Sequence, residues 1–261
     1  MGTEEMLSYL RAIVITASLG ALTFGPVESA KAAAPRDAVP DEPQPPASDQ
    51  TEVGPVFLLS LGGKLYDDLW SILDTKPPEG RNPPLKDVDS IASADTWRCV
   101  TCHGWDYSGA EIGGKTFPSL RAFAGAEPDA VRSRLRDPAH PFPADALSDT
   151  ALEVLALFIT AGQYDRSEFV SETGQALGSP EFGQDIFEGA CISCHQLDGR
   201  MFLRGDKGRA TLGSVARERP TQALHRIMNG VPAAEMLSLR FLSEVQIADL
   251  LAYLQTLDGN N

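Results

Sequence analysis

The sequence predicts an all-α chain in which two similar domains follow one another in tandem. The first observation is the pattern Cys-x-x-Cys-His, which occurs at residues 99–103 and again at residues 191–195. The second is a repeated helical periodicity: two apolar patterns with i, i+3, i+4, i+7 spacing lie 95 residues apart, one after each Cys-x-x-Cys-His pattern. A duplicated motif followed by a duplicated helix indicates one fold used twice.

The Cys-x-x-Cys-His patterns contain every cysteine of the chain and are typical of covalent haem attachment. Two thiols at this spacing reach the two vinyl groups of one porphyrin, and the next imidazole binds the iron. Two haem c groups are therefore predicted. A four-cysteine zinc site gives no reason for the histidines, and a dithiol redox pair needs a βαβ context. The predicted attachment residues are Cys99, Cys102, Cys191 and Cys194, and the predicted proximal iron ligands are His103 and His195.

Residues 1–34 are predicted to be a secretory signal peptide. Ala12 to Leu22 is an apolar run that is too short to span a bilayer easily, and small residues from Ala30 to Ala34 offer a cleavage site. Because two acidic residues oppose the single Arg11, an uncleaved membrane anchor is the alternative. In either case we expect the haem domains to face the periplasm, with membrane contact only through an uncleaved segment.

Two segments of different character precede the first haem motif. Residues 35–54 are rich in proline and acidic side chains, so we expect an extended tether. Residues 55–90 are predicted to be an N-terminal helical extension with an insertion. Within them, Gly62 to Leu73 carries apolar residues on one helical face, and Pro77 ends the pattern. We expect this helix to pack against the first haem domain.

The two domains are predicted at residues 91–166 and 171–261, and their last helices align at an offset of 95. Ser148 is a candidate N-cap for the first of these helices, and Ser243 with Gln246 is a candidate capping box for the second. The apolar positions that coincide are Leu152, Leu155, Ala156 and Ile159 with Ile247, Leu250, Leu251 and Leu254.

The second domain resembles the tandem class I c-type cytochromes. Gly183–Phe187 leads into Cys191, and a short helix at Thr221–Asn229 precedes the loop Gly230–Met236 and the final helix. The resemblance implies two helical domains, each wrapped around one covalent haem, and a role in electron transfer.

The first domain departs from the pattern of that family. The family has an aromatic residue shortly before the haem motif, but Asp95 stands four residues before Cys99. Gly63–Tyr66 looks like the missing helix start displaced upstream, with Pro77–Asp95 as an insertion.

The resemblance also implies a sixth ligand for the second iron. Met236 lies at the family's methionine position, six residues before the final helix. Three other residues are weaker candidates. Met201 follows the motif too closely, while Met228 and His225 lie on a short helix where a core or surface role is more usual.

The first iron needs a different partner, because the chain has no methionine between Cys99 and Cys191. His140 lies in a proline-rich loop that resembles the one ahead of Met236, so it is the predicted ligand. An open five-coordinate iron, Lys115 as ligand, and a surface role for His140 remain alternatives. The aromatic residues expected to pack on the first porphyrin are Trp97, Trp105 and Tyr107.

These ligands predict an asymmetric pair of haems. A second imidazole lowers the reduction potential relative to His/Met ligation, so electrons should pass from the first haem to the second. The favoured function is a periplasmic electron carrier, or the electron-accepting subunit of a dehydrogenase, with another redox protein such as an oxidase or cytochrome as partner. The alternative is an enzyme similar to dihaem peroxidases, with its chemistry at the first haem. The formal net charge of −14 argues against nucleic acid as a partner.

Overall fold

Helices dominate the computed structural model, which describes residues 54–143, 146–200 and 211–257. The predicted signal peptide, nearly all of the tether, and Met201 lie outside these residues. We call residues 54–165 the N-lobe and residues 166–257 the C-lobe. The N-lobe contains α2 (Pro55–Ile72), α3 (Cys99–His103), β1 (Ala110–Ile112), β2 (Lys115–Phe117), α4 (Pro128–Leu135) and α5 (Asp149–Ala161); the C-lobe contains α6 (Pro180–Ala190), α7 (Ile192–His195), α8 (Leu212–Glu218), α9 (Pro220–Asn229) and α10 (Glu244–Thr256).

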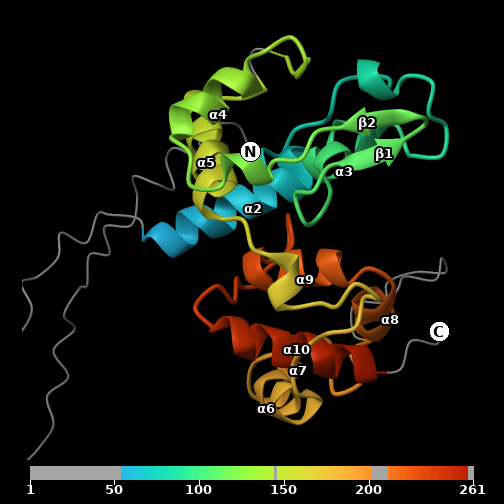
Figure 1. Cartoon of the computed structure of the whole chain (residues 1–261), viewed down its shortest axis with the longest axis vertical. Helices are drawn as coiled ribbons and strands as arrows, with labels where there is room; N and C mark the ends of the chain where they lie inside the picture. The colour runs from blue at the N-terminus through green and yellow to red at the C-terminus, as the bar shows by residue number, and fades with distance from the viewer. Residues whose placement is uncertain (1–53, 144–145, 201–210, 258–261) are drawn as a thin grey trace, which may run out of the picture. The chain divides into compact units, whose positions relative to one another are not determined.

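In the N-lobe, α2 packs across α5 (Figure 1). Gly62 makes the close approach possible: a Cβ atom there would overlap the side chain of Phe158 and would lie 2.7 Å from the carbonyl oxygen of Val154. One turn later, the ring of Tyr66 packs on Phe158 with 5.6 Å between centroids. The helix expected from Gly62 is therefore present, and it packs on the first domain as expected.

The C-lobe repeats this crossing with α6 and α10 (Figure 1). A Cβ atom on Gly183 would overlap the carbonyl oxygen of Asp249 and would lie 2.8 Å from Cβ of Tyr253. Four residues after Gly183, the ring of Phe187 packs on Tyr253 at 5.4 Å. The contact partners Asp249 and Tyr253 each lie 95 residues after their counterparts in α5.

The two final helices also begin in the same way. The side chain of Ser148 accepts a hydrogen bond from the amide of Ala151 at the start of α5. Ser243 and Gln246 form a reciprocal capping box at the start of α10. Both predicted caps are confirmed. The helix crossings correspond as well, since Tyr66 packs in the N-lobe at the position that Phe187 occupies in the C-lobe.

Two features of the N-lobe were not predicted. The first is a β-hairpin, in which β1 pairs antiparallel with β2 through a turn at Gly113 and Gly114, both with positive φ. The expectation of purely helical structure is wrong here, because a short hairpin gives little periodic signal. The second is a kink in α2 at Asp68, whose carboxylate accepts the amides of Trp70 and Ser71 and restarts the helix.

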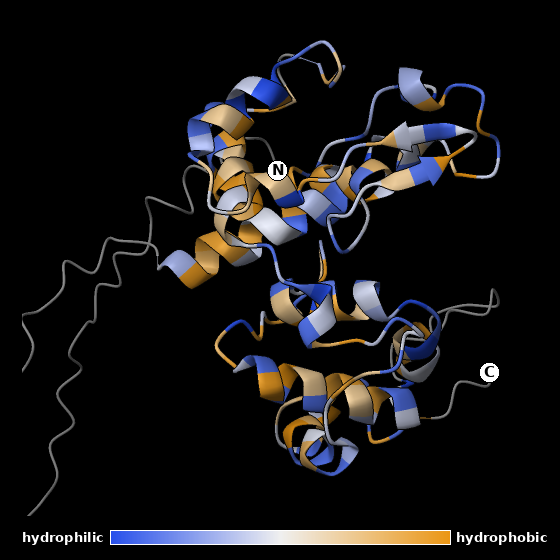
Figure 2. Ribbon diagram, viewed as in Figure 1, coloured by the Kyte–Doolittle hydropathy of each residue, from blue (hydrophilic) through white to orange (hydrophobic). Residues whose placement is uncertain are grey.

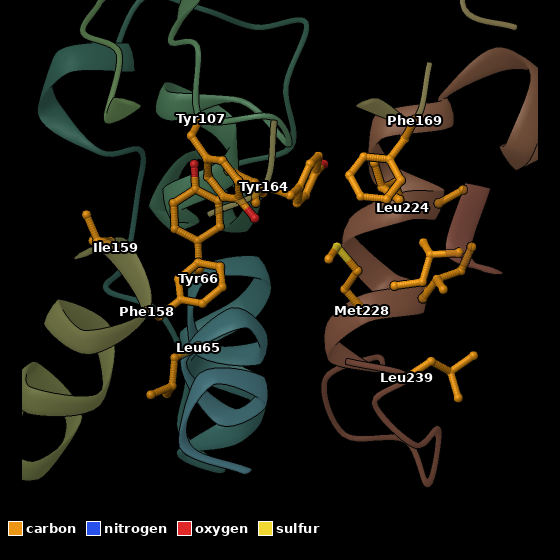
Figure 3. Packing of buried hydrophobic residues seen from close by; sticks show 14 of the residues in the cluster. Leu65, Tyr66, Tyr107, Phe158, Ile159, Tyr164, Phe169, Leu224, Met228 and Leu239 are labelled. Atoms are coloured by element: carbon orange, nitrogen blue, oxygen red, sulfur yellow. The ribbon is translucent and has the colours of Figure 1, made fainter. Parts of the chain in front are cut away.

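A shared core joins the lobes into one compact unit. Figure 2 shows hydrophobic residues along α2, α5 and α10 and more hydrophilic ones along α4. In Figure 3, Tyr66, Tyr107 and Phe158 gather on the N-lobe side, and Tyr164 points toward Phe169 on the other side. None of the helices in the described residues has the length and apolar character needed to cross a membrane.

Candidate functional site

The first Cys-x-x-Cys-His pattern forms the single short helix α3, which side chains of the N-lobe hold in place. The hydroxyl of Tyr66 donates to the carbonyl oxygen of Gly104 at 2.7 Å, and Thr101 Oγ1 donates to the carbonyl oxygen of Asp95 at 2.6 Å. Gly104 has φ of +76°, a conformation that glycine adopts without strain, so the chain turns sharply just after the histidine.

The thiols of this helix lack the electrostatics of a redox pair. Burial raises the pKa of Cys99 to about 12 and that of Cys102 to about 11. A catalytic dithiol needs a pKa lowered by nearby positive charge, so that a reactive thiolate forms at neutral pH. The environment of Cys99 and Cys102 therefore does not fit dithiol redox chemistry.

His103 and His140 are brought together by the fold of the N-lobe. Their ring centroids lie 6.1 Å apart, and the ring planes are inclined by 31°. A metal–imidazole bond is about 2.0–2.1 Å long, so two imidazoles on opposite sides of one ion have centroids about 6 Å apart. The observed separation fits two rings that share one iron.

Hydrogen bonds fix the tautomer of both rings. His103 Nδ1–H donates to the carbonyl oxygen of Pro118 at 2.9 Å, and His140 Nδ1–H donates to the carbonyl oxygen of Arg134 at 2.8 Å. A carbonyl oxygen only accepts, so in the neutral rings the proton resides on Nδ1 and Nε2 keeps its lone pair. Metal-binding histidines commonly use their second nitrogen in this way. The residues present therefore fit a haem iron held between them.

The loop that carries His140 is held by hydrogen bonds within the loop and by one aromatic ring that packs on the rest of the N-lobe. The amide of His140 donates to the carbonyl oxygen of Asp137 at 2.8 Å, and the Asp137 carboxylate accepts the amide of Ala139. Two residues after His140, the ring of Phe142 contacts Trp70 and Trp97 at centroid distances of 6.2 and 6.1 Å. The loop thus presents His140 from an anchored position.

Lys115, the alternative ligand for the first iron, is engaged elsewhere. It lies on β2, is exposed, and its Nζ donates to the carbonyl oxygen of Pro84 at 2.6 Å. This bond fastens the hairpin to the inserted segment. The geometry favours His140.

The second pattern follows α6 directly. Cys191 is the C-cap of α6, and its amide donates to the carbonyl oxygen of Phe187 at 2.8 Å. His195 ends α7 and is half-buried, and burial lowers its pKa. A buried aromatic residue one turn before the first cysteine therefore positions this motif.

Met236 lies in the segment between α9 and α10, which we call the methionine loop (residues 230–242). The side chain of Met236 is half-buried, and its carbonyl oxygen accepts from Lys64 Nζ at 3.4 Å. The pairing of Met236 with His195 on one iron stays a prediction.

The weaker candidates His225 and Met228 have other roles. His225 is fully buried; its Nε2–H donates to the carbonyl oxygen of Gly63 at 2.9 Å, and its Nδ1 accepts from the hydroxyl of Tyr107 at 3.3 Å. Burial lowers the pKa of His225 to about 4, so the ring is neutral. Met228 is only 8 % exposed and belongs to the hydrophobic core.

The aromatic residues near α3 differ from expectation. Tyr107 is fully covered by protein side chains, and Trp97 is 5 % exposed with its indole nitrogen bonded to Gly80. Their rings are core elements, so the expectation that they pack on a porphyrin is wrong for Tyr107. Trp105 is half-buried and lies near the guanidinium groups of Arg98 and Arg226, which are 5.8 and 5.3 Å from its ring centroid.

Sequence reasoning missed the residues that join the lobes. Asp67 is fully buried and binds Arg98 of the N-lobe and Arg226 of the C-lobe, the latter at 3.0 Å. Lys64 and Arg240 make further contacts between lobes. No local pattern marks these residues, because their partners lie far away in the sequence.

Among the residues that the structure describes, no three Cys, His, Asp or Glu side chains converge as a set that could hold a metal ion. Each Cys-x-x-Cys-His motif has its own histidine and lies among the helices of its own lobe.

Comparison with curated protein sequences gives no match. Residues 181–258, from the start of α6 to just beyond α10, match the Cytochrome c family. This segment contains the Cys191–His195 motif and the methionine loop, and a domain of this family carries covalent haem c. The chain therefore contains a cytochrome c domain at residues 181–258.

Proposed function

We propose that the protein is a periplasmic dihaem cytochrome c that transfers single electrons between redox partners. The N-lobe holds a haem with two histidine ligands, His103 and His140, and the C-lobe holds a haem with His195 and Met236. The observation that carries the proposal is the arrangement of His103 and His140, with centroids 6.1 Å apart and both Nδ1 atoms bonded to backbone carbonyls.

The common packing of the lobes supports a second haem domain. The N-lobe has its own Cys-x-x-Cys-His helix, and α2 crosses α5 by the same glycine and aromatic contacts that join α6 and α10. The C-lobe matches the Cytochrome c family, so the same frame in the N-lobe is best explained as a second copy.

The axial ligands set the direction of electron flow. A bound haem supplies a reversible one-electron couple at its iron. Imidazole stabilises ferric iron more than thioether sulfur does, so the N-lobe haem has the lower potential. Electrons would therefore enter at the haem that His103 and His140 would hold and leave from the one that His195 and Met236 would hold.

The partner is another redox protein, either a dehydrogenase that this chain serves as electron-accepting subunit or a downstream oxidase or cytochrome. Residues 1–34 send the chain to the periplasm as a cleaved signal or hold it to the membrane as an anchor. The net charge of −14 favours a partner with a basic surface at low ionic strength.

The bonds of His140 favour a carrier over a peroxidase-like enzyme. Substrate chemistry at the N-lobe iron needs an open coordination position, so His140 would have to leave. Its amide and its Nδ1 are both bonded to backbone carbonyls, which opposes that movement.

A potentiometric titration tests the proposal. We expect two one-electron steps. His140→Met should raise only the lower reduction potential. Met236→Ala should lower the upper reduction potential and abolish the weak red-edge absorption of ferric iron bound to methionine. In a one-electron couple, about 59 mV corresponds to a tenfold change in equilibrium constant, so a gap of two or three such intervals makes transfer nearly one-way. Coincident steps that ignore both substitutions would refute the assignment, and rapid turnover of peroxide by the wild-type protein would favour the enzyme.

A further inference from the structure

The methionine loop of the C-lobe contacts the N-lobe at two points. Lys64 of α2 reaches the loop at Met236, and Arg240 of the loop reaches the N-lobe at Gly162. The proposed sixth ligand of the second iron therefore makes one of these contacts itself and lies four residues before the other.

The first contact is a close convergence of three groups. Lys64 Nζ donates to the carbonyl oxygen of Met236 at 3.4 Å, and both lie over Gly230, which begins the loop. A Cβ atom on Gly230 would lie 2.5 Å from the carbonyl oxygen of Met236 and 2.7 Å from Cε of Lys64. Gly230 also has φ of +81°. Only glycine lets the lysine stem and the loop backbone meet here.

The second contact is made by Arg240. Its Nη2 donates to the carbonyl oxygen of Gly162 at 2.6 Å, and its Nε donates to Oδ1 of Asn229 at 2.8 Å. The guanidinium lies over the ring of Phe158 with 5.6 Å to the centroid. Arg240 thus joins the far end of the loop to the end of α9 and to α5.

Further hydrogen bonds and an ion pair join α2 to α9 next to these two contacts. Ser60 Oγ donates to the carbonyl oxygen of Asn229 at 2.8 Å, His225 bonds to the carbonyl oxygen of Gly63, and Asp67 pairs with Arg226. These bonds fasten α9, from which the loop emerges, to α2. The N-lobe therefore supports the loop at its start, at Met236 and at its end.

We propose that Lys64 and Arg240 are positioning residues for the methionine ligand of the second iron, so that the N-lobe helps to hold Met236 in place. The inference rests on the proposed function, because it requires Met236 to bind the iron. A thioether is a weak ligand that water or an added base can replace, and a tethered loop reduces the population in which the sulfur is released. The bond from Lys64 is longer, at 3.4 Å, than a strong charge-assisted hydrogen bond, so its loss should shift such an equilibrium by about threefold.

The test uses the holoprotein with Lys64→Met, which keeps the apolar stem and removes the donor. The matched control is Lys76→Met, because Lys76 is exposed just beyond α2. Imidazole is added to the ferric protein, and loss of the red-edge absorption of methionine-bound iron reports displacement of Met236. We expect Lys64→Met to lower the imidazole concentration for half-displacement about threefold. We also expect it to lower the potential of the second haem and to leave the first unchanged, while Lys76→Met should match the wild type.

Arg240→Gln provides a second, independent variant, and it should also ease displacement of Met236. Imidazole titrations of both variants that match the Lys76→Met control would overturn the inference while leaving Met236 as ligand. Absence of the red-edge absorption from the wild-type protein would instead overturn the ligand assignment, and the inference with it.

Discussion

At the scale of single residues, His103 and His140 lie close together in the N-lobe, with 6.1 Å between their ring centroids. Each ring donates from Nδ1 to a backbone carbonyl, so each is fixed in the tautomer that leaves Nε2 available for a metal. In the proposed His103/His140 ligation, both rings therefore keep the nitrogen that would bind the iron. The sequence identified His140 through the lack of methionine in this segment, but the carbonyls of Pro118 and Arg134 could be found only in the fold.

Removal of His140 should open the first iron. We expect the ferric His140→Gly holoprotein to bind cyanide at least about ten times faster than the wild type, since each 1.4 kcal/mol of lost ligand binding multiplies the open population by ten. Stopped-flow absorbance measures the rate. His225→Gln serves as control, because His225 is bonded within the core. Equally fast binding by the wild type would contradict His140 as ligand.

His225 should make folding depend on pH. Its pKa in the folded protein is about 4, against 6.5 in an exposed chain, because burial disfavours the charged ring. Between these values the unfolded chain takes up a proton that the folded protein does not. Stability is therefore constant with respect to this group above about pH 6.5 and falls as the pH drops toward 4, by about 2–3 kcal/mol at pH 4.5.

Denaturant titrations at pH 7 and 4.5 check this prediction. The wild type should lose about 2–3 kcal/mol more free energy of unfolding than His225→Gln over this interval, since glutamine does not titrate. Arg226 and Arg240 further oppose the charged ring, whereas Asp67 favours it. Equal losses in the two proteins would show that His225 is accessible to protons in the folded state.

At the scale of helices, both lobes depend on a glycine where two helices cross. Gly62 lets α2 approach α5, and Gly183 lets α6 approach α10, each followed four residues later by an aromatic ring. The start of each final helix could be predicted because apolar periodicity and serine caps are local signals. The pairing of α2 with α5 was only partly predictable, because a long insertion separates α2 from the haem motif. The hairpin did have a local signal, the two-residue turn Gly113–Gly114, but its strands are too short to show a periodic pattern. The kink at Asp68 had no such signal.

Two glycines of α6 allow a matched comparison. Gly183→Ala should lower the free energy of unfolding by about 1–3 kcal/mol, because the added methyl group overlaps the backbone of α10. Gly189→Ala should be neutral or should stabilise by about 0.5–1 kcal/mol, because the methyl group enters open space and alanine favours the helix. Chemical denaturation measures both. If Gly183→Ala were as stable as Gly189→Ala, the described crossing of α6 and α10 would be wrong.

At the scale of the whole molecule, the described lobes form one compact unit through a buried polar interface. Asp67 is fully buried and is shared between Arg98, which precedes the first haem motif, and Arg226 of α9. The partners of such a group are separated by up to 159 residues, so no sequence pattern predicts them. These ion pairs fasten the two lobes to each other, which suits the proposed transfer of electrons between two haems.

The central claim is that each lobe carries a covalent haem, and the mass of the intact denatured holoprotein tests it most directly. Denaturation releases any group that is not covalently bound, so the mass counts the attached haems alone. We predict the mass of the mature chain plus two haems, falling to one haem when Cys99 and Cys102 are both replaced by serine. A wild-type mass that corresponds to the chain plus one haem would contradict the account.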